Sequence, residues 1–111
     1  MILKKNADFG QLFQKGLCIK NEYFSFFFVR DNDLKIGFAV NKRCANKPIR
    51  NKLKRIAREL WRTNFRHFHL PVHMVIVTSE RILELDYKAR EIYFKSQLQK
   101  VEQQLKATTQ A

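Results

Sequence analysis

The chain has 111 residues and a formal charge of +12 at neutral pH, because 22 lysines and arginines outweigh 10 acidic residues. Hydrophobic residues make up 45% of it and include ten phenylalanines, enough for one core, which excludes a disordered basic tail. A chain of this length predicts one domain over residues 1–111. Its strong positive charge indicates a polyanionic partner, either nucleic acid or an anionic membrane surface.

No apolar run reaches the roughly 18 residues that a transmembrane helix needs. Residues 1–6 lack the apolar region of a signal peptide, so we expect the chain to be cytoplasmic. Cys18 and Cys44 lie far apart without a paired spacing. In that compartment they are expected to be reduced thiols rather than a disulfide or a metal site.

The first predicted element is a short helix, which Asn6 or Asp8 can cap and Gly16 can end. Its apolar side chains are Phe9, Leu12 and Phe13. Two extended segments follow, a brief strand over residues 17–20 and an aromatic-rich strand over residues 23–30.

Turn-forming residues at 31–33 lead to a third extended segment over residues 34–41, in which apolar and other residues alternate. The alternation predicts that Ile36, Phe38 and Val40 face the core. We expect the second and third strands to pair as an antiparallel hairpin. The same parity places Phe24, Phe26 and Phe28 on one face and Tyr23, Ser25 and Phe27 on the other.

A basic helix is predicted next, from about residues 46–48 to about Arg66, with Pro48 in its first turn. From residue 42 to residue 66 there are ten basic residues and a single acid, Glu59. An apolar stripe for the core is formed by Ile49, Leu53, Ile56, Ala57 and Leu60. Cations recur every four residues at Arg50, Lys54, Arg58 and Arg62. Like charges at this spacing repel, so a helix that keeps them is best explained by an external polyanion.

A strand over residues 72–78 and a final helix from about Asp86 to Leu105 complete the chain. The apolar face of that helix is predicted to comprise Tyr87, Ala89, Ile92, Tyr93, Leu98, Val101 and Leu105. Residues 106–111 are expected to form a flexible tail. The predicted order αβββαβα, without repeats or linkers, indicates a two-layer α+β sandwich.

No self-sufficient active site is visible in the sequence. The carboxylates are scattered, and there is neither a P-loop nor a nucleophile elbow. His67, His69 and His73 form only a loose pattern, so no metal ligands and no catalytic residues are assigned.

Phosphate binding by the basic helix is the favoured interpretation, with Asn46, Asn51, Lys52 and Arg55 beside the main cationic row. A solvated charged face is the alternative. A membrane partner is less favoured because the apolar stripe is needed for the core. Phe9, Phe13 and Phe27 are either core residues or rings on which unpaired bases stack, beside a shallow groove at Ser25, Gly37 and Ala39.

The chain resembles the protein subunit of bacterial ribonuclease P over nearly its whole length. The resemblance runs through residues 3–9, Phe13 and Gly16, then residues 37–43. It is most specific at residues 50–59, which are similar to the Arg-Asn-Arg helix motif of that family.

The resemblance implies a four-stranded mixed sheet with a left-handed crossover, as in domain 2 of ribosomal protein S5. It also implies that a catalytic RNA, which holds Mg²⁺, removes the 5′ leader of precursor tRNA while the protein alone binds no cofactor. The partners would be these two RNAs, with no membrane and no obligate protein partner. RNA-binding residues would be Lys42, Arg43, Asn46, Arg50, Asn51, Lys52, Lys54, Arg55, Arg58 and Arg62. The groove for the leader would be lined by Lys5, Phe9, Phe13, Phe27 and Lys35.

Four positions depart from the family pattern: Ala45, Pro48, Lys52 and Glu80. Lys52 keeps the charge of the second arginine of the motif but loses its forked donor geometry. The rival interpretations are a ribosomal or rRNA-binding module and a nuclease that acts without an RNA subunit.

Overall fold

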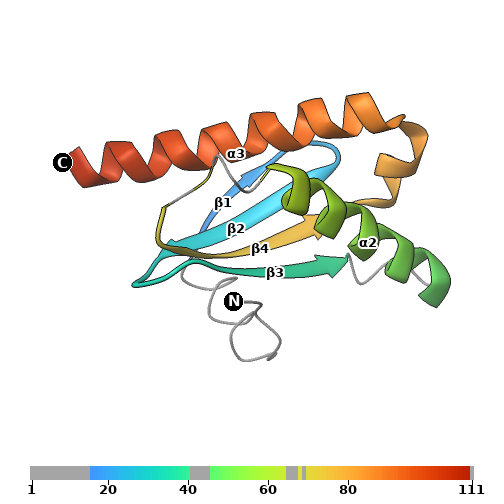
Figure 1. The fold of residues 1–111 in the computed structure, drawn as a ribbon, viewed down its shortest axis with the longest axis horizontal. Helices are drawn as coiled ribbons and strands as arrows, with labels where there is room; N and C mark the ends of the chain where they lie inside the picture. The colour runs from blue at the N-terminus through green and yellow to red at the C-terminus, as the bar shows by residue number, and fades with distance from the viewer. Residues whose placement is uncertain (1–15, 41–45, 65–67, 69, 111) are drawn as a thin grey trace.

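The computed structural model of the chain describes residues 16–40, 46–64, 68 and 70–110. Its elements are β1 (Leu17–Lys20), β2 (Phe24–Arg30), β3 (Lys35–Val40), α2 (Lys47–Asn64), β4 (Val72–Thr78), the 3₁₀ helix η2 (Glu80–Glu84) and α3 (Tyr87–Gln110). The four strands form one sheet, and both long helices pack on the same face of it (Figure 1). All the strands, α2 and α3 were predicted; η2 was not, and the predicted first helix lies outside the described residues.

The strand order in the sheet is β1-β2-β4-β3, so the predicted β2–β3 hairpin is wrong. β4 lies between them, antiparallel to β2 and parallel to β3. The physical reason is the burial of β4 on both faces: Met74 and Ile76 are buried in the main core, and Val75 is buried on the reverse side. A strand that is apolar on both faces gains most from the centre of a sheet, which outweighs the short β2–β3 connection.

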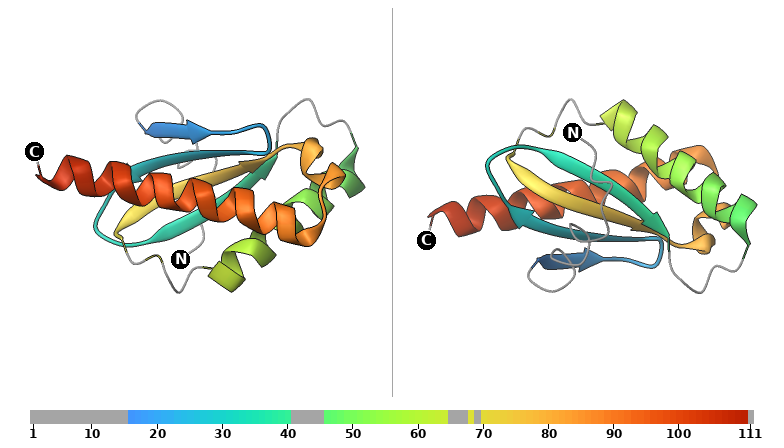
Figure 2. Two further views of the ribbon diagram at one scale, coloured as in Figure 1. Left: turned by 90° about the horizontal axis from the view of Figure 1, so that it is seen from above. Right: turned by 90° about the horizontal axis from the view of Figure 1, so that it is seen from below.

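The parallel neighbours β3 and β4 are joined through α2, which packs against both. The two views of Figure 2 show that this crossover is left-handed, whereas nearly all such connections are right-handed. The mixed four-stranded sheet and the left-handed crossover agree with the fold implied by the family resemblance.

The core lies between the sheet and the two helices. Phe24, Phe26 and Phe28 alternate along β2 and are buried, as predicted. From α2, the predicted stripe is confirmed: Leu53, Ala57 and Leu60 are buried, while Ile49 and Ile56 pack at its edge. The strand face predicted for β3 is also confirmed, because Ile36, Phe38 and Val40 all belong to this core.

The predicted apolar face of α3 is partly wrong. Ile92 is 66% exposed, and Tyr87 and Tyr93 are also exposed. The buried stripe instead consists of Phe94, Gln97, Leu98, Val101 and Leu105. A polar residue interrupts this stripe: the Gln97 side-chain amide donates a hydrogen bond to the Ile19 carbonyl at 3.1 Å, which makes its burial possible. The helix continues to Gln110, so residues 106–110 are helical where a tail was expected.

Phe94→Ala tests this orientation of α3. The Phe94 ring is fully buried and meets Phe24 and Phe26 edge-on, with ring centroids 5.4 Å apart in each case. Its truncation should lower the free energy of unfolding by about 3–5 kcal/mol in equilibrium urea titrations. Ile92→Ala, the matched control on the exposed side, should change that free energy by less than about 0.5 kcal/mol. Equal losses in the two variants would contradict the placement of α3.

Candidate nucleic-acid interface

The outward face of α2 carries a row of cations. Packing of the apolar stripe on the sheet turns the other residues of the helix outward. The exposed side chains are Asn46, Lys47, Arg50, Asn51, Lys52, Arg55, Arg58 and Arg62, and Lys54 is half-buried. Every predicted RNA-binding residue from Asn46 to Arg62 is therefore placed on or beside one surface. Lys42 and Arg43 lie outside the described residues.

The first turn of α2 contains no acidic residue. Helix N-termini are positively polarised and normally favour acids, so Lys47 and Arg50 stand at positions where cations are unfavourable. The Asn46 carbonyl accepts the first helical hydrogen bond from the Arg50 amide at 3.0 Å. Asn46 is therefore the N-cap of α2, and the first turn after it is an electropositive surface suited to phosphate.

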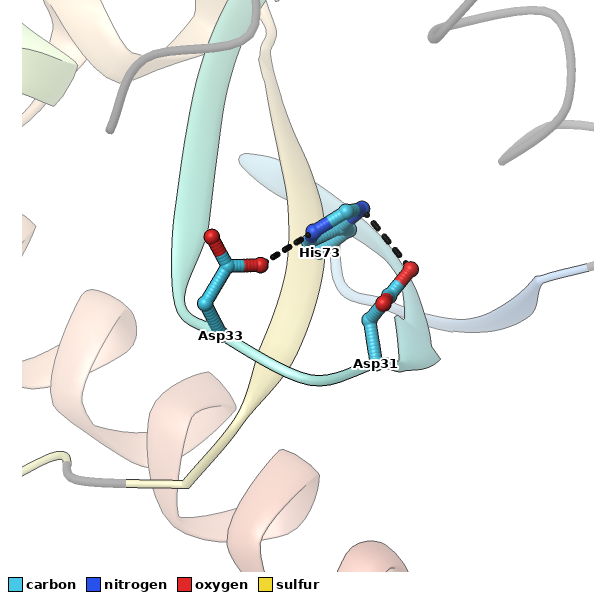
Figure 3. Close-up of side chains that lie close together, drawn as sticks. All are labelled: Asp31, Asp33 and His73. Atoms are coloured by element: carbon cyan, nitrogen blue, oxygen red, sulfur yellow. Dashed lines mark hydrogen bonds and ion pairs between the residues drawn. The ribbon is translucent and has the colours of Figure 1, made fainter.

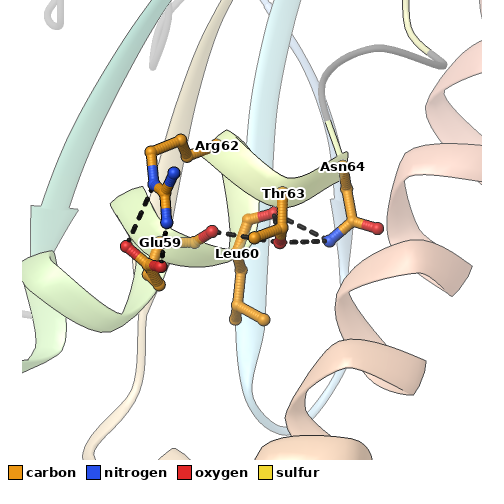
Figure 4. A network of polar contacts seen from close by, with 5 residues as sticks. All are labelled: Glu59, Leu60, Arg62, Thr63 and Asn64. Carbon is orange, nitrogen blue, oxygen red and sulfur yellow. Dashed lines mark hydrogen bonds and ion pairs between the residues drawn. The ribbon is translucent and has the colours of Figure 1, made fainter.

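Arg62 of this row forms an ion pair with the one acid of the helix, Glu59. Its guanidinium donates two hydrogen bonds to the Glu59 carboxylate, the one from Nε spanning 3.2 Å (Figure 4). The Arg62 guanidinium lowers the pKa of Glu59, and Glu59 raises the pKa of Arg62. Both side chains are exposed, so the pair contributes little to stability. Its effect is to reduce the charge that Arg62 offers to a ligand.

Further cations of α2 lie on the N-terminal side of Glu59. Within the described ranges, no carboxylate lies within ion-pair distance of Lys52, Lys54, Arg55 or Arg58. Among the described residues, the cationic charge without an acidic partner thus runs from Lys52 to Arg58.

The last turn of α2 is held by its own side chains (Figure 4). Thr63 Oγ1 donates to the carbonyls of Glu59 and Leu60, both at 3.1 Å, and Asn64 Nδ2 donates to Leu60 O at 2.8 Å. These carbonyls lie before the last four of the helix, so the side-chain bonds add to the backbone ladder rather than replace it. They brace the last turn, which also carries Arg62.

Phe27 lies on the reverse face of the sheet, away from the helices, as predicted from its parity. Its strand neighbours on that face are Cys18 in β1 and Val75 in β4, and Gly37 lies beyond Val75. Ser25 and Ala39 flank Val77 in the next row, because β4 separates the two strands. The predicted groove residues of β2 and β3 therefore share a face without touching as a hairpin.

The other predicted groove residues divide into two groups. Lys35 lies on the same reverse face, in the row that also contains His73 and Val29. Lys5, Phe9 and Phe13 lie outside the described residues.

His73 forms a cluster with the two aspartates of the β2–β3 turn (Figure 3). Its Nδ1 lies 3.2 Å from an oxygen of Asp31, and its Nε2 lies 2.9 Å from an oxygen of Asp33. The hydrogen bond with His73 lowers the pKa of Asp33. This interaction therefore stabilises the fold at neutral pH and is lost as acid protonates Asp33. The cluster ties the turn to β4 at one edge of the reverse face.

An open cavity of about 330 Å³ lies between α2 and the start of α3. Sequence reasoning assigned Tyr87 to the apolar face of the last helix and did not single out Arg90, so it identified neither as a residue of this cavity. The signal was available: positions 87, 90, 94, 98 and 101 form one helical stripe, whose first two members extend beyond the apolar core.

None of the helices in the described ranges is long and apolar enough to span a bilayer. Comparison with known proteins shows that the family model described as ribonuclease P matches residues 1–102. The chain belongs to the ribonuclease P protein family.

Relatives of similar length support this membership. The ribonuclease P protein component of Natranaerobius thermophilus is 34% identical over 77% of this chain and 76% of its own. That of Alkaliphilus metalliredigens is 32% identical over 80% of this chain and 82% of its own.

Solved structures share the fold. The ribonuclease P protein of Thermotoga maritima superposes with a TM-score of 0.74 and 25% identity, covering 89% of this chain and 96% of that one. The Staphylococcus aureus protein gives a TM-score of 0.77 at 23% identity, covering 90% and 94%.

Glu59→Gln tests whether the α2 surface meets phosphates. The substitution removes the charge that neutralises Arg62, so RNA affinity at low salt should rise. The slope of log affinity against log salt should steepen by up to about one unit, as for one added phosphate contact. Fluorescence anisotropy with labelled RNA over a salt series would measure both.

Glu22→Gln is the matched control, because Glu22 pairs with Arg81 at 3.3 Å and neither residue belongs to α2. It adds the same net charge elsewhere on the protein. If both variants steepen the slope equally, the effect is one of overall charge and α2 has no special role.

Proposed function

We propose that this chain is the protein component of a ribonucleoprotein endoribonuclease that matures tRNA 5′ ends. In this proposal α2 binds the catalytic RNA, and the reverse face of the sheet holds the single-stranded leader of precursor tRNA. The observation that carries the proposal is the uncompensated cationic surface of α2 in a chain of the ribonuclease P family.

The protein would act by electrostatics and positioning. Catalytic RNA and precursor tRNA are both polyanions, so their close approach is opposed by repulsion between phosphates. Cations such as Arg55 and Arg58 replace condensed counterions and lower that repulsion. Arginine adds paired hydrogen bonds to phosphate oxygens, and Lys52 and Lys54 act as point charges.

Leader binding would use a different surface. An unpaired base can stack on the Phe27 ring without sequence preference, and Lys35 on the same face would attract the leader phosphates. The leader and the catalytic RNA would then occupy opposite parts of the molecule, because Phe27 faces away from the helix layer while α2 belongs to it.

Mg²⁺ held mainly by the RNA subunit would supply the hydrolytic chemistry. Among the described residues, the group that could best hold a metal ion consists of Asp31, Asp33 and His73. They fit Mg²⁺ poorly, since this ion prefers an octahedron of oxygen ligands and both carboxylates here face an imidazole nitrogen. The protein residues would therefore bind and orient RNA rather than hold the metal.

A reconstitution experiment tests the proposal. Precursor tRNA is incubated at low Mg²⁺ with the protein alone, with the catalytic RNA alone, and with both. Cleavage at the mature 5′ end is expected only with both, because the protein replaces part of the screening that high Mg²⁺ would provide. Absence of stimulation would favour the ribosomal interpretation.

Cleavage by the protein alone would favour a self-sufficient nuclease, for which the Asp31–His73–Asp33 cluster is the candidate acid–base group. His73→Ala separates the two cases. It should leave cleavage by the reconstituted enzyme intact, whereas a nuclease based on this cluster would lose its activity.

Phe27→Ala tests leader binding. Loss of one stacked base should weaken binding of leader-bearing precursor by about fivefold or more, with a much smaller effect on mature tRNA. Val29→Ala is the control, because Val29 is a half-buried residue two positions along the same face of β2. If Phe27→Ala weakens both RNAs equally, or if Val29→Ala has the same effect, Phe27 serves the fold rather than the leader.

A further inference from the structure

The cavity between α2 and α3 combines features that neither the cationic surface nor the core has alone. Its volume of about 330 Å³ lies at the lower end of the range for small-molecule sites, so it fits one small group rather than a chain segment. Six of the residues that line it are Lys52, Arg55, Ile56, Leu60, Tyr87 and Arg90.

The α2 wall of the cavity is amphipathic. Leu60 is buried and Ile56 half-buried, so they form an apolar floor continuous with the core. Lys52 and Arg55 are exposed at its rim and, in the described part of the chain, have no carboxylate within ion-pair distance. The wall therefore offers a hydrophobic surface and free positive charge within two helical turns.

The α3 wall adds an aromatic ring and a fixed guanidinium. Tyr87 is 48% exposed although it lines the cavity, so its ring is accessible to a ligand. Arg90 is half-buried, and its Nε donates to the Ile82 carbonyl at 3.0 Å. That bond orients the guanidinium and leaves its terminal amino groups available for an anion.

Glu59 gives the cavity a direction. It lines the same space two helical turns beyond Lys52, roughly 10 Å along the axis. Because Arg62 neutralises Glu59, the Glu59 end has little net charge, and an anionic group is attracted to the Lys52 end. The remaining acceptor capacity of the Glu59 carboxylate can take a hydrogen bond from an amino group of a ligand.

A ligand that fits this arrangement is anionic at one end and carries a flat ring with amino groups at the other. A simple phosphate would leave the apolar floor and the tyrosine unused, and an apolar peptide would leave the cations unpaired. A nucleotide meets all of these conditions, because its base can stack on an aromatic side chain while its phosphate meets lysine and arginine.

We propose that this cavity receives a single unpaired ribonucleotide, with its phosphate toward Lys52 and Arg55 and its base against Tyr87. Arg90 contacts the nucleotide from the α3 side. The inference rests on the proposed function in one respect, since the RNA bound by α2 would supply the nucleotide. A free mononucleotide offers the same chemistry, and the experiment distinguishes the two sources.

The first arm uses the protein without any RNA. Adenosine 5′-monophosphate is titrated into isotopically labelled protein, and amide shifts are followed by NMR, with ribose 5-phosphate as the control that lacks a base. We expect saturable shifts at residues 55–60 and 87–90 for the nucleotide and weaker ones for the sugar phosphate. Equal responses to both compounds, or shifts spread over all basic residues, would overturn the proposal.

The second arm compares matched variants of α3. Tyr87→Ala removes the ring, and Arg90→Lys keeps the charge but loses the fork. Tyr93→Ala and Lys88→Ala are the controls, because both residues are exposed on α3 and do not line the cavity. Tyr87→Ala should weaken nucleotide binding about fivefold or more, and the controls should leave it unchanged. Equal losses in variants and controls would overturn the proposal.

The third arm measures the affinity of the same variants for the catalytic RNA. If the RNA supplies the nucleotide, Tyr87→Ala weakens this complex as well; if affinity is unchanged while mononucleotide binding is lost, the cavity serves a free nucleotide. Stimulation of precursor cleavage by the wild-type protein is read separately. A failure of the cavity proposal therefore remains distinguishable from a failure of the proposed function.

Discussion

The one-sided packing of α2 is the constraint on which the rest of the molecule depends. Burial of Leu53 and Leu60 contributes about 3–6 kcal/mol together, if each leucine contributes at the usual scale. Repulsion between cations at four-residue spacing costs only a few tenths of a kcal/mol per pair. The core therefore holds the helix in place despite its charge, and the uncompensated cations are presented to solvent in a fixed arrangement. RNA phosphates that neutralise them would remove a cost that the folded protein already carries.

The position of β4 determines how this helix is presented. Because β4 is apolar on both faces, it occupies the centre of the sheet, and the chain must leave β3 and return beside it through α2. The resulting left-handed crossover sets α2 over β3 and β4, whereas α3 covers β1 and β2. The middle of α2 faces the beginning of α3, and the end of α2 lies near the middle of α3. The sheet itself separates the cationic surface from the face that carries Phe27.

Local patterns in the sequence were sufficient to predict the strands and the basic helix. The two-residue period of β2 and β3 and the apolar stripe of α2 each place their own residues correctly. Strand pairing was predicted wrongly because it depends on competition between distant segments, and adjacency in sequence favoured a hairpin. The rotation of α3 was partly wrong, because the polar Gln97 interrupts the buried stripe and the exposed Ile92 and Tyr93 suggested a different apolar face. Lys5, Phe9, Phe13, Lys42 and Arg43 lie outside the described residues, and the RNA-binding roles of all the predicted site residues remain predictions.

The same helical stripe serves two purposes along α3. Where the helix crosses the sheet, Phe94, Leu98 and Val101 fill the core. One and two turns earlier the helix has passed the sheet edge and faces α2, so Arg90 and Tyr87 occupy equivalent positions without strands to bury them. An apolar residue at either place would be exposed or would close the cavity against α2. The change from apolar to amphipathic residues along one stripe therefore marks the point at which packing ends and ligand contact can begin.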